Sequence, residues 1–254
     1  MPPLPSISIV TVVLNATGTI RDCLQSVHCQ THPVEHILVD GRSTDGTMDI
    51  LAAHTQKLAR VVSEPDAGIY DAMNKGIRLA RGEVIGILNA DDLYASENTL
   101  FEVAEAFARS GADSCYGDLV YVDPADITKV LRFWRSGEFI SEKFRWGWMP
   151  PHPTFFVRAV VYQKYGAFDT SLGSAADYEL MLRLLLKHGI SASYIPKVLV
   201  RMRSGGISNA SLKNRMAANR MDRKAWQVNH LKCYPWTLWL KPLRKMTQFV
   251  SQQR

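Results

Sequence analysis

Two adjacent carboxylates, Asp91 and Asp92, follow a short apolar segment, residues 84–88, in the run Asn89-Ala-Asp91-Asp92. Carboxylate oxygens in such a place suit Mg²⁺ or Mn²⁺, which bind one or two carboxylates together with the phosphates of a substrate. The same residues are compatible with a turn in which Asp91 or Asp92 caps the next helix. The sequence therefore indicates a divalent-cation site at a strand end, with a helix cap as the alternative.

A second acidic segment, Asp40-Gly-Arg-Ser-Thr-Asp45-Gly, follows the apolar residues 36–39. A carboxylate held at a strand end can accept the imide N–H of uracil. The segment also has the residues of a glycine turn followed by a helix cap at Ser43 or Asp45. The two interpretations are compatible, because capping residues can hold the loop beneath a base.

Apolar, β-branched segments alternate with segments of helical periodicity, which is typical of an α/β fold with an open, mostly parallel sheet flanked by helices. Ligands bind such sheets beyond the carboxyl ends of the strands, where Asp40 and Asp91 are expected. The expected strands cover residues 6–14, 36–40, 60–63, 84–88, 114–121 and 192–195. A helix capped by Thr19 is expected after the first strand. The other expected helices cover residues 47–58, 70–80, 99–110, 178–187 and 212–230.

The charge of the chain changes sign near residue 200. Residues 1–200 hold 18 Lys and Arg against 23 Asp and Glu, a formal charge of −5, whereas residues 201–254 hold 12 against one, a charge of +11. The basic part includes Tyr234, Trp236 and Trp239 close to Lys241, Arg244 and Lys245. This combination favours an anionic membrane surface over nucleic acid as a partner, and the alternative is a helix that packs its tryptophans on the protein body.

The apolar runs are of strand length and far short of the roughly 20 residues that cross a bilayer. The first six residues lack a basic segment before the apolar run. We therefore expect a cytoplasmic protein that contacts the membrane, if at all, peripherally at its inner face.

Several other classes of site are not supported by the sequence. The four cysteines form no C-x-x-C pair. His28, His32 and His36 recur every fourth residue, but Pro33 disfavours a helix there, so a zinc site is not expected. The loop after the first strand, residues 15–19, has one glycine and no basic residue, which argues against a nucleotidyltransferase or a dinucleotide oxidoreductase.

Five blocks of the sequence together resemble the family 2 glycosyltransferases of the GT-A fold. They occur in the family's order between residues 6 and 208 and begin at Ile9, Asp40, Asp66, Asn89 and Ala176. The sequences of the five blocks, in the same order, are Ile-Val-Thr-Val-Val-Leu-Asn, Asp-Gly-Arg-Ser-Thr-Asp-Gly, Asp-Ala-Gly-Ile-Tyr-Asp-Ala-Met-Asn-Lys-Gly, Asn-Ala-Asp-Asp and Ala-Asp-Tyr-Glu-Leu-Met-Leu-Arg. The resemblance is strongest to bacterial enzymes that build exopolysaccharide, O-antigen or glycolipid sugars.

The resemblance implies a role for each matching residue. Asp177 corresponds to the catalytic base, although the glutamate that precedes it in the family is Ala176 here, and a first-turn helix acid is the alternative. Asp91 is the expected main metal ligand, with Asp92 assisting, and Asn89 replaces the first acid of the family's D-x-D. Arg203 stands where many relatives have a metal-binding histidine and is expected to neutralise phosphate. The residues expected around the nucleotide and the acceptor are Thr11, Asn15, Asp40, Asp66, Lys75, Asn89, His152 and Arg203.

The implied protein is an inverting, Mn²⁺- or Mg²⁺-dependent hexosyltransferase with a nucleoside-diphosphate-sugar donor, preferably UDP-linked. A hydroxyl of a glycan or a lipid-linked molecule is the expected acceptor. The catalytic domain is expected to cover residues 1–208 and a basic, aromatic helical tail residues 209–254. The alternative is a catalytically silent module that binds a nucleotide or a glycan.

Overall fold

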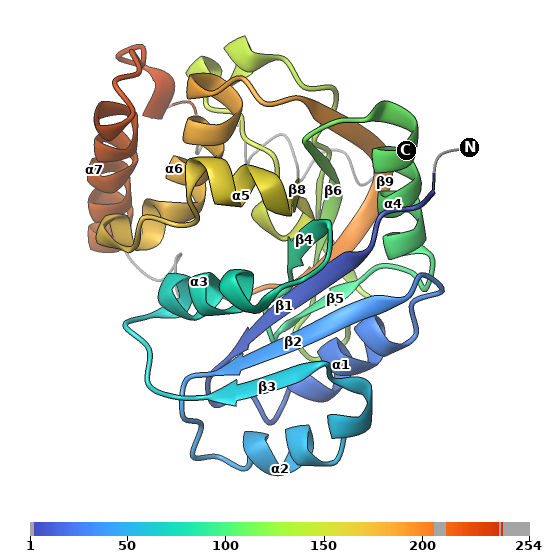
Figure 1. The fold of residues 1–254 in the computed structure, drawn as a ribbon. Helices are drawn as coiled ribbons and strands as arrows, with labels where there is room; N and C mark the ends of the chain where they lie inside the picture. The colour runs from blue at the N-terminus through green and yellow to red at the C-terminus, as the bar shows by residue number, and fades with distance from the viewer. Residues whose placement is uncertain (1–2, 206–211, 239, 241–254) are drawn as a thin grey trace.

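A single mixed sheet with helices on both faces forms the centre of the molecule (Figure 1). The computed structural model describes residues 3–205, 212–238 and 240, and only the backbone in residues 212–218. Within these residues the strand order is β3-β2-β1-β4-β8-β6-β9-β5, and β7 pairs with β6. The strands are β1 (Ile7–Val13), β2 (Val34–Asp40), β3 (Arg60–Ser63), β4 (Val84–Ile87), β5 (Asp92–Tyr94), β6 (Ser114–Val122), β7 (Val130–Trp134), β8 (Phe156–Arg158) and β9 (Ala192–Arg203).

The expected α/β architecture is confirmed, and its parallel part is the N-terminal one. Strands β1 to β4 are parallel to one another. Beyond β4 the sheet is mixed, because β8, β7 and β5 each enter antiparallel to the strands beside them. The loops that follow β1, β2, β3 and β4 therefore leave the sheet at one edge, which collects the polar residues of the first four sequence blocks.

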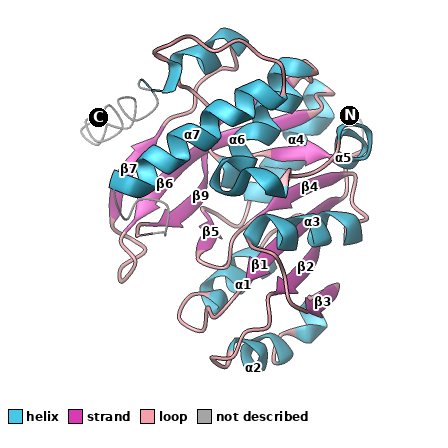
Figure 2. Cartoon of the chain, turned by 90° about the vertical axis from the view of Figure 1, so that its left-hand side faces the viewer, coloured by secondary structure: helices cyan, strands magenta, loops and turns pink. Residues whose placement is uncertain are grey.

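Helices cover the two faces of the sheet and enclose two separate apolar cores. On one face, α1, α2 and α4 bury residues such as Leu24, Leu51 and Phe107. On the other, α3, α5, α6 and α7 bury residues such as Met73 and Trp226, and Figure 2 shows these helices in front of the sheet. The helices are α1 (Ile20–His28), α2 (Thr47–Ala52), α3 (Ile69–Leu79), α4 (Thr99–Ser110), α5 (Ala159–Tyr165), α6 (Ala176–Met181) and α7 (Leu212–Val228).

Some elements differ from the expectation for identifiable reasons. The helix expected over 47–58 ends at Ala52 and is followed by a 3₁₀ turn at Thr55–Lys57. The helix expected over 178–187 begins at Ala176 and continues as a π-helical turn, Leu182–Lys187. The strand expected at 192–195 continues to Arg203. Pro196 interrupts the sequence pattern of a strand, and a register shift in the pairing of β9 with β6 accommodates it.

Helix α7 packs on the body next to α6 and the 3₁₀ segment Thr170–Ala175. Trp226 is buried there, and its indole N–H donates to the hydroxyl of Tyr178 at 3.0 Å. The expected domain boundary at residue 208 lies outside the described residues, as do Trp239, Lys241, Arg244 and Lys245. None of the described helices is both long and apolar enough to cross a membrane.

Candidate active site

The loop after β2 is folded around Asp40. This side chain is fully buried, and its carboxylate accepts hydrogen bonds from the backbone N–H groups of Arg42 and Ser43 and from the hydroxyls of Ser43 and Ser63. With its oxygens engaged in this way, Asp40 holds the loop after β2 together from beneath. Its placement does not fit the prediction that it contacts a base directly.

Asp66 lies over this loop and is more accessible. One carboxylate oxygen accepts from the backbone N–H of Gly68 at 2.9 Å, and the other lies 2.5 Å from the position that a Cβ on residue 41 would take. Glycine at position 41 therefore admits the Asp66 carboxylate. Lys75 on α3 holds the segment that carries it, since its Nζ donates to the Pro65 carbonyl at 2.7 Å and pairs with Glu64 at 2.9 Å.

Asn15 joins the loops after β1 and β2 at the exposed rim. It has a positive φ of 50°, its side-chain oxygen accepts from the N–H of Thr44 at 2.8 Å, and its own N–H donates to Ser43 Oγ at 2.8 Å. Asparagine tolerates this left-handed conformation better than most residues. Asn15 therefore lies beside the loop after β2.

Thr11, in contrast, points away from this edge. It is fully buried on the α1 face of β1 and shares hydrogen bonds with Nε2 of His36, at 3.0 Å, and with the thiol of Cys23. Alternation along β1 places Thr11 on the same face as Ile9 and Val13. The prediction that Thr11 lines the nucleoside pocket is therefore wrong.

Of the three histidines that recur every fourth residue, only His28 and His36 form a pair near Thr11, as expected from the helix-breaking Pro33 between them in sequence. Nδ1 of His36 lies 3.3 Å from Nε2 of His28, whereas the ring of His32 bonds to the Pro5 carbonyl. Burial lowers the pKa of His36 to about 3 and that of His28 to about 4. Both rings are consequently neutral near pH 7.

We call Asn89, Asp91, Asp92 and Arg203 the β4 edge. Asp92 begins β5 and Asn98 is the N-cap residue of α4, so neither Asp91 nor Asp92 caps that helix. Asp92 is fully buried, and both burial and the charge of Asp91 raise its pKa well above the usual range. The amide of Asn89 donates to one oxygen of Asp92 at 3.2 Å.

Arg203, at the end of β9, reaches the same place from the other half of the sheet. Pairing of Asp92 with Met202 brings the two segments together. The buried guanidinium donates to the carbonyl of Asp91 at 2.8 Å and forms an ion pair with Asp22 on α1. Arg203 thus fixes the backbone of the acid pair and offsets its charge.

Unpartnered oxygen atoms at the β4 edge fit a bound divalent cation. Among the residues that the structure describes, Oδ1 of Asn89, Oδ1 of Asp92 and Nε of Arg203 are buried without a hydrogen-bond partner. Buried polar atoms rarely lack partners, and hard oxygen ligands are those that Mn²⁺ and Mg²⁺ prefer. The described residues contain no group of three His, Cys, Asp or Glu side chains able to hold a metal by themselves, so further ligands would come from phosphate and water.

We call Tyr70, His152, Phe168 and Asp177 the Asp177 site. Asp177 is half-buried in the first turn of α6, and its Oδ1 accepts from the N–H of Tyr178 at 2.7 Å. The hydroxyl of Tyr70 also hydrogen-bonds to the Asp177 side chain, and burial together with the Asp177 charge raises the pKa of Tyr70. Tyr70 therefore stays protonated and can donate to the carboxylate.

His152 faces the same carboxylate from the 3₁₀ turn His152–Thr154, which packs against β4 and β9. Its ring meets Phe168 edge-on at 5.5 Å, and Phe168 also lies 5.3 Å from the ring of Tyr70. Burial lowers the pKa of His152, and the charge of Asp177 opposes this shift. The structure thus brings together two expected residues, His152 and Asp177.

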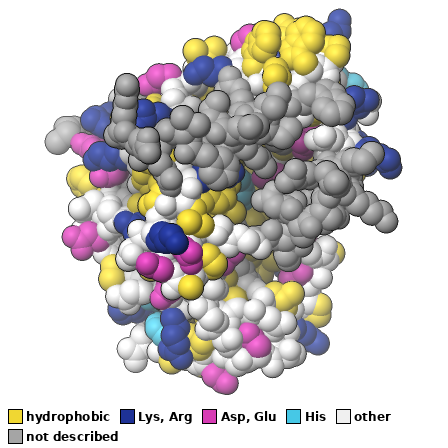
Figure 3. All heavy atoms as spheres, turned by 180° about the vertical axis from the view of Figure 1, so that it is seen from behind, with side chains coloured by type: hydrophobic (Ala, Val, Ile, Leu, Met, Phe, Trp, Pro, Cys, Tyr) yellow, Lys and Arg dark blue, Asp and Glu magenta, His cyan; other side chains and the backbone are white. Residues whose placement is uncertain are grey.

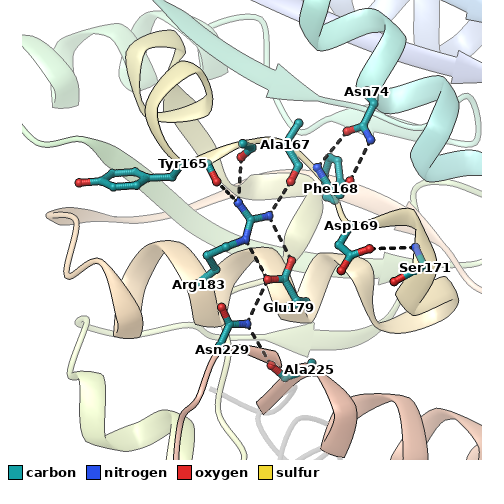
Figure 4. A network of polar contacts seen from close by, with 11 residues as sticks. Asn74, Tyr165, Ala167, Phe168, Asp169, Ser171, Glu179, Arg183, Ala225 and Asn229 are labelled. Atoms are coloured by element: carbon teal, nitrogen blue, oxygen red, sulfur yellow. Dashed lines mark hydrogen bonds and ion pairs between the residues drawn. The ribbon is translucent and has the colours of Figure 1, made fainter. Parts of the chain in front are cut away.

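Behind Asp177, a buried polar network fixes the orientation of α6 (Figure 4). Arg183 pairs with Glu179 at 2.8 Å and donates to the carbonyls of Tyr165, Gly166 and Ala167. Asn229, after α7, donates to Glu179 at 3.0 Å. The network ties the Asp177 helix to the chain on both sides of it.

Asn74 makes a further clamp from α3. Its side chain exchanges two hydrogen bonds of 2.9 Å with the backbone of Phe168 (Figure 4). Tyr70, Asn74 and the Glu179–Arg183 pair were not predicted from the sequence as parts of the site. Their signals were present in the third block and in a Glu–Arg spacing of four residues within an apolar helix, which favours an ion pair on one helix face.

Two solved structures share this architecture. Residues 1–349 of Staphylococcus aureus TarS, in complex with UDP-GlcNAc, match with a TM-score of 0.68 and 18% identity over 88% of this chain and 70% of that one. The Pyrobaculum calidifontis mannosyltransferase PcManGT, in complex with GDP-Man and Mn²⁺, matches with a TM-score of 0.66 and 19% identity over 100% of this chain and 79% of that one. The fold is therefore GT-A.

Sequence comparison shows the family. The model of glycosyl transferase family 2 matches residues 8–166. A PGL/p-HBAD biosynthesis glycosyltransferase of Mycobacterium tuberculosis is 31% identical over 210 residues, which are 81% of this chain and 80% of the relative. An uncharacterized glycosyltransferase of the same species is 30% identical over 189 residues, 73% and 71% of the two chains. The chain belongs to the family 2 glycosyltransferases.

Proposed function

We propose that this glycosyltransferase moves a hexosyl group from a nucleoside-diphosphate sugar, preferably UDP-linked, to a hydroxyl of a glycan or lipid-linked acceptor, with inversion at the anomeric carbon. The observation that carries the proposal is the acid pair of the β4 edge, where buried oxygens of Asn89 and Asp92 lack partners beside the accessible Asp91. A diphosphate with its cation would complete this group.

The donor nucleoside would bind at the loops after β1, β2 and β3. Asp66 is the proposed acceptor for the imide N–H of uracil, since one of its carboxylate oxygens has no hydrogen bond among the described residues. Asp40, Asn15 and Lys75 would act by holding those loops in place. TarS in complex with UDP-GlcNAc supports a UDP donor, and PcManGT in complex with GDP-Man makes a guanosine donor the main competitor.

Mn²⁺ or Mg²⁺ would be held by Asp91, with Asp92 and Asn89 beside it, and would stabilise the charge that develops on the leaving diphosphate. Arg203 keeps the Asp91 backbone in position. Its proposed contact with phosphate would use the unpartnered Nε or require release from Asp22.

Asp177 would act as the general base. As the acceptor oxygen forms its bond to the anomeric carbon, the bond from that carbon to the diphosphate oxygen breaks, and Asp177 takes the hydroxyl proton. A single displacement of this kind inverts the configuration. Tyr70 would orient the Asp177 carboxylate toward the acceptor, and the neutral His152 would lie beside this carboxylate.

The decisive experiment is a donor screen with purified protein, Mn²⁺, Mg²⁺ or EDTA, and a panel of UDP-, GDP- and dTDP-sugars, in which release of the nucleoside diphosphate is measured. We expect metal-dependent release from one donor, reduced at least about a hundredfold in Asp91→Ala. Asp126→Asn, a change to an exposed carboxylate of another loop, is the matched control and should leave release unchanged.

Two results would contradict the proposal. If EDTA leaves the release of nucleoside diphosphate unchanged, the proposed role of the metal is wrong. Nucleotide binding detected by calorimetry with no release from any donor, with or without added glycan acceptors, would identify a silent binding module instead.

A further inference from the structure

Three exposed aromatic rings meet on a surface far along the chain from the acid pair. Trp146 lies in the 3₁₀ segment Ser141–Trp146, and Tyr234 and Trp236 follow α7. Their ring centroids are 5.0 to 6.1 Å apart, and the three residues are 45%, 37% and 44% exposed. We call these three residues the aromatic patch.

The patch is a built feature, because neighbouring contacts fix both segments. The buried hydroxyl of Thr237 donates to the carbonyl of Arg145 at 2.6 Å, and Leu238 is also buried. The hydroxyl of Tyr234 donates to Glu142 at 3.1 Å. Hydrogen bonds between residues 92 positions apart thus hold the two segments together with the rings exposed.

Basic residues accompany the patch. Lys232 is exposed beside it, and the carbonyl of Lys232 accepts from Arg145. The sequence from residue 201 onward carries a formal charge of +11. Figure 3 shows hydrophobic side chains gathered at the top of the molecule, with Lys and Arg side chains at the margin; the segments of the patch lie at this end in Figure 1.

We infer that the aromatic patch is a docking surface for an anionic lipid bilayer. Trp and Tyr combine an apolar ring with a polar tip and concentrate at the level of lipid head groups, and exposed clusters of such rings mark interaction sites. Basic residues next to them add attraction to anionic head groups. A neutral glycan would use the rings but gain nothing from the charge, so the bilayer is the occupant that both features fit.

The inference is independent of the transfer reaction, because vesicle binding needs neither donor nor metal. The full chain is mixed with vesicles of phosphatidylcholine alone or with phosphatidylglycerol added, and the bound fraction is measured by flotation. We expect binding to the anionic vesicles, weakened by added salt. The Trp146→Ser/Trp236→Ser variant should bind at least about tenfold more weakly.

Phe101→Ser is the matched control, since Phe101 is 42% exposed on α4, outside the patch, and its loss should leave vesicle binding unchanged. Thermal unfolding of each variant verifies that it is folded. Equal binding by the double variant and the wild type, or no binding to anionic vesicles at all, overturns the inference. Retardation of the wild type in gels that contain a neutral polysaccharide, without vesicle binding, would assign the rings to a glycan instead.

Discussion

The β4 edge and the Asp177 site are both built around carboxylates, yet they are completed in different ways. At the β4 edge, Asn89 and Asp92 keep buried oxygens without partners, and Arg203 bonds to the backbone of Asp91 and to Asp22. At the Asp177 site, Tyr70 hydrogen-bonds to the carboxylate and a satisfied network fixes the helix behind it. The first site leaves oxygen atoms open for the proposed cation, whereas the side chains of the second are already held by contacts within the protein.

The Asp177 site should carry the largest catalytic effect. Asp177→Asn keeps the shape of the side chain but removes its ability to take a proton, so we expect turnover to fall at least about a hundredfold. Donor affinity, measured by calorimetry with Mn²⁺, should stay within about twofold of wild type, because the proposed donor contacts lie at the loops after β1, β2 and β3 and at the β4 edge. A loss confined to donor affinity would show that the two sites are not separate in function.

The network behind Asp177 should matter for stability more than an exposed pair of the same spacing. Arg183→Met leaves the buried Glu179 without its cation and should cost about 3–5 kcal/mol in urea unfolding. Arg109→Met breaks the exposed pair with Glu105, also four residues apart, and should cost less than about 1 kcal/mol. Similar losses of unfolding free energy in both variants would contradict the role of the network as a buried support for α6.

At the β4 edge, by contrast, a residue proposed for function should lower the free energy of unfolding. Asp92→Asn replaces a buried carboxylate that lacks a full set of partners, so the metal-free protein should gain about 1–3 kcal/mol of unfolding free energy. The same change should weaken Mn²⁺ binding in the presence of nucleoside diphosphate. A variant that loses stability without metal would indicate that Asp92 is part of the structural core alone.

Tyr70→Phe tests whether the Asp177 site is organised by this hydroxyl. Loss of one hydrogen bond to a charged group should lower turnover by about tenfold, with the KM for the donor unchanged. Tyr165→Phe is the control, because that hydroxyl points away from the network in Figure 4. An unchanged turnover in Tyr70→Phe would remove Tyr70 from the site.

The pair formed by His28, at the end of α1, and His36, on β2, should make stability depend on pH. The folded state lowers the pKa of His36 to about 3, so between the unfolded value of 6.5 and that limit the unfolded chain binds more protons. Stability is therefore full above pH 6.5, and the His36 contribution should fall by about 1.4 kcal/mol for each pH unit below it, with His28 adding to the slope down to its pKa of about 4. His36→Leu should flatten this part of the pH profile of urea unfolding, and an unaltered slope would exclude His36 as the cause.

Much of the candidate site could be predicted because its residues follow strand ends. Asp91 and Asp92 were found through the apolar run before them, and Asp177 through its sequence block. Thr11 was misplaced because a block resemblance does not state which face of β1 a residue occupies. Asp40 was expected to contact a base, whereas the serines and backbone groups of its own loop engage it completely.

The sequence by itself determined the α/β class, the strand ends where acids gather, and the opposite charges of the two parts of the chain. Periodicity and composition are local properties, so they can be read without knowing the fold. Only the tertiary structure decided that Arg203 meets Asp91, that Tyr70 meets Asp177, and that Trp146 joins Trp236. These pairs are separated by 90 to 112 residues in sequence, and their contacts depend on strand order and helix packing, which no local pattern specifies.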